Sequence, residues 1–248
     1  MILADVGNTH ITCVRDDTFP ELSPWSIDTE HVSLRSLIVS FSSVPDENIL
    51  VCSVVPKISD LFLKLKKNVR FIGTDIEVPI ECRYDRRTVG IDRLVCAYAA
   101  TLTHPGTRLV IDFGTAITMD ILSPRGTYEG GLILPGVGST LRVFSSCALL
   151  PEQIALPPEQ QRDRSVIPRD TDESIRRGVR EGFAEMINGM VEKYRRRLHF
   201  DRRAPILITG GDAPHIMPQL QFPSHYEPFL VFHGMRSLAG KLPPRKKF

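Results

Sequence analysis

The sequence predicts an α/β protein made of two similar halves, and three observations carry this prediction. Short apolar runs alternate with segments of helical periodicity along the chain. Twice, an apolar strand ends in an aspartate that is followed by a glycine turn and a threonine, at Asp5–Thr9 and at Asp112–Thr115. The break His104-Pro105-Gly106 separates the two copies. We therefore expect one domain over residues 1–105 and a second over residues 106–248.

Length and composition bound the class of protein. The 248 residues, 42% hydrophobic and 24% charged, suit two domains of about 100–150 residues with sizeable cores. The formal net charge of +2 argues against nucleic acid as the main partner. The five cysteines are scattered without Cys-x-x-Cys spacing, so we expect reduced thiols in a cytoplasmic protein. No apolar run is long enough to cross a membrane, and an early aspartate argues against a signal peptide.

The first half begins with a β-hairpin. Strands are predicted at Ile2–Asp5 and Ile11–Arg15 because both runs are apolar and rich in β-branched residues. A turn that contains Gly7 and Asn8 joins them. The other elements predicted in this half are a strand at Ile49–Ser53, a helix at Lys57–Lys67, a strand at VRFIG and a helix that begins at Gly90.

The second half repeats this beginning. The run RLVIDFGTAITMDIL indicates a strand, a glycine turn and a strand, and GTYEGGLILPG adds a third strand. A long helix is predicted from about Thr171 to Leu198, with Thr171 and Asp172 as suitable N-cap residues. Its apolar residues recur every three or four positions, at Ile175, Val179, Phe183, Met186, Met190, Tyr194 and Leu198. The run APILITGGDAPHI indicates a buried strand, a Gly-Gly turn and the start of a helix.

Each hairpin turn has a structural and a functional interpretation. Glycine and asparagine are favoured in any tight β-turn, and for a single copy this explanation is the stronger one. Alternatively, Gly7 lets the backbone approach a ligand closely, and Asn8 and Thr9 can join the N–H groups of the turn in holding a phosphate. Asp5 can hold Mg²⁺ through water. The second copy, at Asp112, favours the functional interpretation.

The ordered set of two hairpins and one Gly-Gly turn resembles the sugar kinase, Hsp70 and actin superfamily. The hairpins resemble the two phosphate loops of that superfamily, and LITGGDA resembles the turn on its adenosine side. The resemblance implies two ribonuclease-H-like halves that face each other across a nucleotide cleft.

The segment GIDRLVCAYAA is a helix that is about to be buried, yet it opens with Asp92 and Arg93. An aspartate in the first turn complements the helix dipole, but the same dipole disfavours an arginine. Near a phosphate-binding cleft both residues gain a role. Asp92 can accept the proton of a substrate hydroxyl. Arg93 can bind a carboxylate or the developing phosphoryl charge.

Nearly the whole chain resembles the type III pantothenate kinases, which catalyse the first step of coenzyme A synthesis in bacteria. The matching segments are, in order, DVGNTHI, CSVVP, a tyrosine ahead of GIDR, IDFGTAITMD, GGLILPG, ALLP, RDT, TGGDA and FHGMRSL. The resemblance implies ATP-dependent phosphorylation of pantothenate to 4′-phosphopantothenate by a cytoplasmic homodimer. It implies no nucleic acid or membrane partner.

The resemblance also implies roles for individual residues. Asp92 is the expected general base, and Asp112 is expected to hold a monovalent cation, K⁺ or NH₄⁺, beside the Mg²⁺ that accompanies ATP. The residues expected to bind substrate are Tyr84, Gly90, Ile91, Asp92, Arg93 and Thr171. The residues expected to bind ATP are Asp5, Val6, Gly7, Asn8, Thr9, His10, Ile11, Thr12 and Thr115.

Three departures from the family concern the rim of the substrate pocket. The family usually has Asn-Pro between the tyrosine and Gly90, whereas this chain has DRRTV, which includes Arg86 and Arg87. Cys96 stands where the family often has asparagine. The charged segment before Thr171 is longer than usual.

Two other functions were weighed against the kinase. A non-catalytic relative that acts as an accessory factor in transcription would not need Asp5, Asp92, Arg93 and Asp112, all of which are present. An actin-like or Hsp70-like ATPase would hydrolyse ATP without a small acceptor, and this chain is short for the subdomain insertions of such proteins.

Overall fold

The computed structural model describes residues 1–18, 21, 23–42, 48–65, 67–144, 156 and 167–242. The ALLP motif, Cys147 and most of the charged segment before Thr171 lie outside these described residues. No helix among the described residues is long and apolar enough to cross a membrane.

The chain forms two compact units. The first contains Met1–Pro105, Gly126–Tyr128 and the chain from Phe229 onward, and the second contains Gly106–Arg125 and Glu129–Pro228. The first crossing coincides with the boundary expected after residue 105. The structure differs from the expected contiguous halves in returning a short segment and the last helix to the first unit, because that helix packs on a helix of the first unit.

The first unit is built on a five-stranded sheet in the order β3-β2-β1-β4-β5. Its strands are β1 Ile2–Val6, β2 His10–Arg15, β3 Trp25–Asp28, β4 Asn48–Ser53 and β5 Asn68–Phe71. The central strand β1 pairs antiparallel with β2 and parallel with β4. Only β3 was not predicted. It is an edge strand whose four residues alternate between half-buried and exposed, so it lacks an apolar run.

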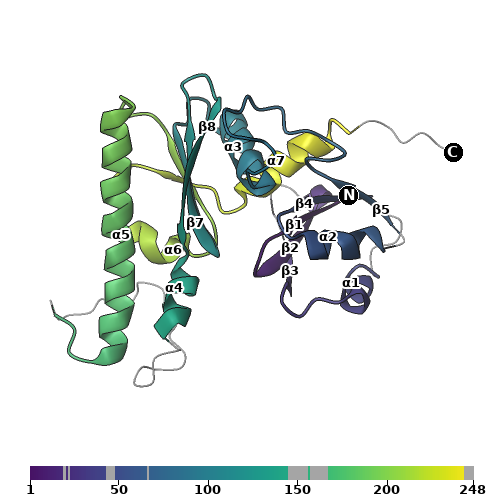
Figure 1. Ribbon diagram of the computed structural model, residues 1–248, viewed down its shortest axis with the longest axis horizontal. Coiled ribbons are helices and arrows are strands. Elements are labelled where there is room, and N and C mark those ends of the chain that lie inside the picture. Colours follow the sequence, from purple (N-terminus) through teal and green to yellow (C-terminus); the bar gives the residue numbers. More distant parts are fainter. Residues whose placement is uncertain are drawn as a thin grey trace. The chain divides into compact units, whose positions relative to one another are not determined.

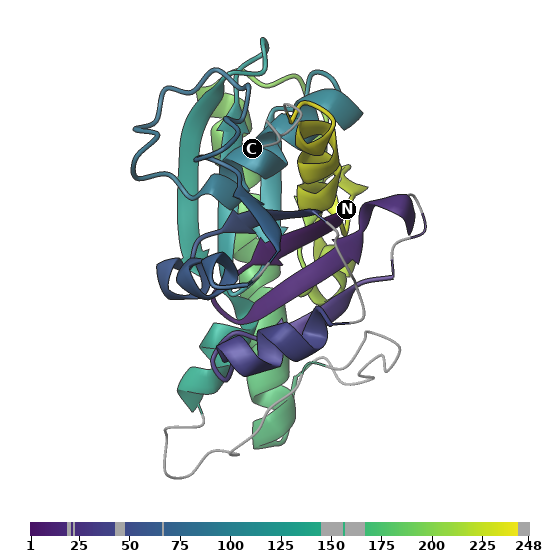
Figure 2. The same ribbon diagram turned by 90° about the vertical axis from the view of Figure 1, so that its right-hand side faces the viewer.

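Helices cover this sheet (Figure 1; Figure 2 gives a second view). They are α1 Leu34–Ser40, α2 Pro56–Leu63, α3 Ile91–Thr103 and, from the end of the chain, α7 Leu230–Ala239. Leu37 and Phe41, at α1, and Phe62 of α2 join the strands in one core cluster. Helix α2 begins one residue before the predicted Lys57 and ends at Leu63 instead of Lys67.

The second unit repeats the topology of the first. Its sheet, read from β8, has the order β8-β7-β6-β9-β10, with β6 antiparallel to β7 and parallel to β9. Its strands are β6 Leu109–Phe113, β7 Ala116–Leu122, β8 Tyr128–Pro135, β9 Ile206–Thr209 and β10 His225–Tyr226. Strands β1 and β6 share one burial pattern, in which a half-buried aspartate is the penultimate residue of an otherwise buried strand. The repeated hairpin in the sequence therefore corresponds to a repeated half-fold.

The helices of the second unit are α4 Val137–Phe144, α5 Thr171–Arg197 and α6 Ala213–Ile216. Helix α5 runs alongside the sheet (Figure 1) and packs Ile175, Val179 and Phe183 into the core of this unit. Its N-cap is Asp170, whose carboxylate accepts the Glu173 N–H at 2.9 Å, rather than the expected Thr171 or Asp172. Short 3₁₀ turns lie at Asp16–Thr18 and Met217–Gln219.

The contact between α3 and α7 depends on a glycine. A Cβ atom at Gly234 would lie 2.6 Å from the carbonyl oxygen of Val95 and 2.7 Å from its Cγ1 atom. At the far end of the contact, the Lys241 ammonium donates to the Tyr98 hydroxyl at 2.5 Å. The matched segment FHGMRSL therefore holds the helix that begins with GIDR.

We predict that Gly234→Ala destabilises the first unit by about 1–3 kcal/mol, because the added methyl group forces α7 away from the α3 backbone. Urea unfolding followed by the fluorescence of Trp25 measures this, since Trp25 is the single tryptophan and lies in the first unit. The matched control is Gly240→Ala in the same region, where the nearest atom to a Cβ is 3.7 Å away. Equal unfolding free energies for the two variants would contradict the packing argument.

Candidate active site

The first hairpin turn is held tightly by backbone and side-chain bonds. Gly7 N–H donates to the His10 carbonyl at 3.0 Å, and a Cβ on Gly7 would lie 3.3 Å from that same oxygen. Thr29, which sequence analysis did not single out, donates its hydroxyl to the Gly7 carbonyl at 2.9 Å and its N–H to the Thr9 carbonyl at 3.0 Å. The turn is therefore a preformed loop directly after Asp5.

The residues expected to bind ATP differ in what they can offer a ligand. Val6 and Ile11 are fully buried, so only their backbone groups are available. Asn8 and His10 are exposed, whereas Asp5 and Thr9 are half-buried. Thr12 lies opposite Asp5 on the neighbouring strand. The turn thus presents polar side chains and backbone N–H groups.

The carboxylates of Asp5 and Asp92 act on the same buried thiol. Cys52 is opposite Asp5 in the pairing of β1 with β4. Burial raises the pKa of the Cys52 thiol well above its ordinary value, and the negative charges of Asp5 and then Asp92 raise it further. The head of α3 and the end of β1 therefore bring two carboxylates to one region of the first unit.

The head of α3 is ordered by its own residues. The Asp92 carboxylate accepts the Arg93 N–H at 2.8 Å, which occupies one of the helix's unpaired N–H groups. Gly90 is required before it, because a Cβ at that position would lie 2.5 Å from Asp92 Oδ1. The Ile91 side chain packs towards Gly73, 3.1 Å from where a Cβ of that glycine would lie. Arg93 is buried, whereas Asp92 is half-buried.

Two tyrosines lie next to Arg93. The Arg93 guanidinium carbon is 5.9 Å from the centroid of the Tyr128 ring. The Tyr84 ring meets the same Tyr128 ring edge-on, with centroids 6.4 Å apart. Tyr128 was missed by sequence analysis, because it stands in the second copy of the repeat, whereas the structure assigns it to the first unit.

The arginines that depart from the family pattern are both engaged. Arg86 donates to the carbonyl oxygens of Val78, at 3.3 and 3.4 Å, and of Ile80. Arg87 forms a bidentate pair with Asp85, with distances of 3.1 and 2.8 Å. The DRRTV segment is therefore a compact loop closed by its own charged side chains. Cys96, the other departure, is a buried residue of α3.

The second hairpin is surrounded by glycines that leave no room for a side chain. A Cβ at Gly210, whose φ is 94°, would collide with the Asp112 carboxylate and the Phe113 carbonyl. A Cβ at Gly136 would collide with the carbonyl oxygens of Gly114 and Thr115. The loops after β6, β8 and β9 therefore meet around Asp112 through close backbone contact.

Polar contacts lock these three loops together. Asp212 donates its N–H to the Phe113 carbonyl at 3.0 Å, and its carboxylate accepts the Gly138 N–H at 3.4 Å. The Ser139 hydroxyl donates to the Thr115 carbonyl at 2.8 Å. Ser139 was not predicted, because no pattern in the sequence marks it. The exposed Thr115 side chain lies in this loop cluster, which can hold an anion or a cation through backbone groups.

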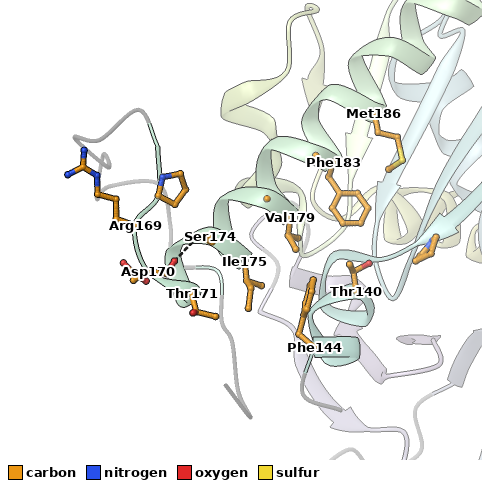
Figure 3. Close-up of a pocket in the computed structure, with 14 residues that line it drawn as sticks. Thr140, Phe144, Arg169, Asp170, Thr171, Ser174, Ile175, Val179, Phe183 and Met186 are labelled. Atoms are coloured by element: carbon orange, nitrogen blue, oxygen red, sulfur yellow. Dashed lines mark hydrogen bonds between the residues drawn. The ribbon is translucent and has the colours of Figure 1, made fainter. Parts of the chain in front are cut away.

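Thr171 lies apart from both hairpins, at the rim of a groove in the second unit. The groove has a volume of about 880 Å³ and lies between α4 and α5. Figure 3 shows Ile175, Val179 and Phe183 directed from α5 toward Phe144 of α4, with Thr171 at one end. The groove is mainly apolar, so it is suited to a hydrophobic partner rather than to a phosphate.

The structure thus gathers the predicted site residues into two sets. The first unit holds the Asp5 hairpin together with Tyr84 and the α3 head, and the second holds Asp112, Thr115 and Thr171. No group of three or more His, Cys, Asp or Glu side chains that could hold a metal ion occurs among the described residues. A cation at either hairpin would therefore be bound by one carboxylate together with backbone, water or phosphate oxygens.

Comparison with known proteins identifies the family. A family model described as type III pantothenate kinase matches residues 1–193. A type III pantothenate kinase from Persephonella marina is 31% identical over 233 residues, which cover 90% of this chain and 86% of the relative. One from Nitratidesulfovibrio vulgaris is 34% identical over 258 residues, which cover 96% and 95% of the two chains.

Solved structures agree on the fold. A conserved Baf family protein from Campylobacter jejuni aligns with a TM-score of 0.64 at 21% identity, covering 97% of this chain and 98% of that one. A protein from Sinorhizobium meliloti described as a 2-dehydro-3-deoxygalactonokinase aligns with a TM-score of 0.53 at 14% identity, covering 100% and 98%. The predicted fold class, α/β with two ribonuclease-H-like halves, is confirmed. This chain belongs to the type III pantothenate kinase family.

Proposed function

We propose that this protein transfers the γ-phosphoryl group of ATP to the primary hydroxyl of pantothenate. The family supports this reaction. The observation that carries it to these residues is the convergence of Asp92, at the ordered head of α3, with Asp5 of the first hairpin at the Cys52 thiol. One carboxylate is thereby available for a proton and a second for the phosphate-bound cation.

Asp92 is the general base in this proposal. Its carboxylate is half-buried and oriented by the Arg93 N–H, so it can accept the hydroxyl proton as the oxygen attacks the γ-phosphorus. Arg93 binds the acceptor, and its guanidinium suits the carboxylate end of pantothenate. Tyr84, Gly90 and Ile91 complete the wall of the acceptor site.

The hairpin turns bind the nucleotide in this proposal. N–H groups of the first turn, with Asn8 and Thr9, hold phosphate oxygens, and Thr115 does so from the second. Asp5 suits Mg²⁺, which is commonly held by one or two carboxylates plus phosphate and water oxygens. Asp112 suits K⁺, because carbonyl oxygens of the tightly packed loops surround its carboxylate. Both cations supply positive charge that offsets the triphosphate and the nearby carboxylates.

We also propose that the protein is a cytoplasmic homodimer. The apolar groove beside α5 supports this, because its floor includes Gly178 and Gly182, where an added Cβ would meet nothing within 4 Å. A helix of a second copy can approach such a surface closely. Thr171, at the rim, would then lie at the acceptor pocket of the partner subunit. The cysteines of the described part of the chain are unpaired, in keeping with a reducing compartment.

We predict that Asp92→Asn lowers kcat by roughly 10²–10⁴-fold, because the amide cannot accept the hydroxyl proton. The change keeps the size of the side chain, so the fold should persist. Turnover with ATP, Mg²⁺ and pantothenate measures the effect, and circular dichroism checks folding. Asp60→Asn, on the exposed side of α2, is the control and should retain activity. A folded Asp92→Asn protein with near wild-type turnover would refute the assignment.

We predict that activity requires K⁺ or NH₄⁺ and that Na⁺ replaces them poorly. A larger monovalent ion suits a loose site of backbone and carboxylate oxygens better than a smaller one. Asp112→Asn should weaken this activation rather than only raise the KM for pantothenate. The measurement is turnover against K⁺ concentration at constant ionic strength, with a bulky organic cation as replacement. Equal rates with and without K⁺ would exclude the site.

We predict that Gly182→Arg converts the dimer into a monomer, because a large charged side chain fills the groove beside α5. Sedimentation at micromolar protein concentration measures the change. Gly189→Arg is the matched control on the same helix: Gly189 is exposed, has open space around it and does not line the groove. A fully active wild-type monomer, or equal assembly of both variants, would contradict the proposed interface.

A further inference from the structure

Tyr128 is fully buried and is fixed on both sides by backbone bonds. Its N–H donates to the Glu81 carbonyl at 2.7 Å, and its carbonyl accepts the Arg83 N–H at 2.9 Å. Thr127, beside it, donates its hydroxyl to the Glu81 carboxylate at 3.0 Å. These bonds tie the start of β8 to the segment that leads to Tyr84.

The same short segment is also fitted against α3. Gly126 has a φ of 81°, and a Cβ there would lie 3.1 Å from Thr101 Cγ2 on α3. The segment is therefore held by α3 on one side and by the chain around Glu81 on the other. A buried ring in this place is fixed in position before any ligand arrives.

The Tyr128 ring contacts two residues of the proposed acceptor site. The Arg93 guanidinium carbon lies 5.9 Å from its centroid, within the range of a cation–π interaction. The Tyr84 ring packs against it edge-on at 67°. Tyr84 is exposed and Arg93 is buried, so one ring supports both an outer and an inner residue of the site.

We propose that Tyr128 is a positioning residue of the acceptor site, whose ring holds the Arg93 guanidinium and the Tyr84 ring where they meet the substrate. This inference rests on the proposed function, in which both residues contact pantothenate. The negative face of the ring stabilises a buried guanidinium and restricts its rotamers. Without the ring, Arg93 would have to be ordered by the substrate itself, at the expense of substrate affinity.

The clamp at Arg86 makes the same arrangement more rigid. Arg86 ties the loop after Tyr84 to the carbonyl oxygens of Val78 and Ile80. Tyr84 is thus held by the loop on one side and by Tyr128 on the other. The structure offers Tyr84 no support of this kind if the Tyr128 ring is replaced by an aliphatic side chain.

The test is steady-state kinetics of Tyr128→Leu and Tyr128→Phe in the full-length protein. We expect Tyr128→Leu to raise the KM for pantothenate about tenfold, while Tyr128→Phe, which keeps the ring, stays within about threefold of wild type. The KM for ATP should change less than about twofold in both variants, because the ring touches only acceptor-site residues. An unchanged KM for pantothenate in Tyr128→Leu, or an equal rise in both variants, would overturn the inference.

A matched control separates positioning from loss of stability. Phe41→Leu also removes a fully buried ring from the first unit, one that packs edge-on against Phe62 at 5.7 Å. We expect it to lower the unfolding midpoint as Tyr128→Leu does while leaving the KM for pantothenate at its wild-type value. A comparable rise in KM for Phe41→Leu would show that destabilisation alone is responsible.

A double-mutant cycle tests whether Tyr128 acts through Arg93. In an Arg93→Lys background, Tyr128→Leu should raise the KM for pantothenate by clearly less than in the wild-type background. Equal effects in both backgrounds would overturn the route through Arg93.

One readout does not depend on catalysis. The Arg93 Nε–H resonance of ¹⁵N-arginine-labelled protein should move in Tyr128→Leu and stay near its wild-type position in Tyr128→Phe. An unmoved resonance in Tyr128→Leu would overturn the inference even if pantothenate is phosphorylated. If the wild-type protein does not phosphorylate pantothenate, the proposed function fails, and this resonance still decides whether Tyr128 positions Arg93.

Discussion

A half-buried aspartate at the penultimate position of each central strand is the constraint on which the rest of the structure depends. The other residues of β1 and β6 are fully buried, so Asp5 and Asp112 each place a carboxylate at the edge of an apolar core. A charge in such a place must be compensated. Compensation is available only where strands end, because loops supply N–H groups, carbonyl oxygens and access for ions. The glycines at positions 7 and 210 follow from this, since each lets backbone approach its hairpin.

A third carboxylate sharpens the electrostatic problem in the first unit. Asp92 joins Asp5 in raising the pKa of the Cys52 thiol, which keeps that buried sulfur protonated and chemically inert. Like charges this near to one another favour the binding of cations with ATP. The same arrangement assigns a different task to each aspartate: one for a metal-bound phosphate, and one, ordered by its own helix, for a proton.

The acceptor side of the proposed site is assembled from remote segments that all converge on α3. Helix α7 packs on its middle through Gly234, the segment at Tyr128 lies against its side, and the loop clamped by Arg86 leads into its first residue. The departure from the family sequence at Arg86 is therefore accommodated by internal hydrogen bonds. It preserves a supported loop in front of Gly90 by different chemistry.

The sequence by itself determined both hairpins, the start of α3 and the course of α5, because burial period, turn residues and the order of motifs are local properties. It identified the family for the same reason. The tertiary structure alone decided that Asp170 caps α5, that β3 completes the first sheet, and that Tyr128 and α7 belong with the first unit. These outcomes depend on the close fit of surfaces that are distant in the chain, such as Gly234 on Val95. No spacing or periodicity in the sequence encodes such a fit.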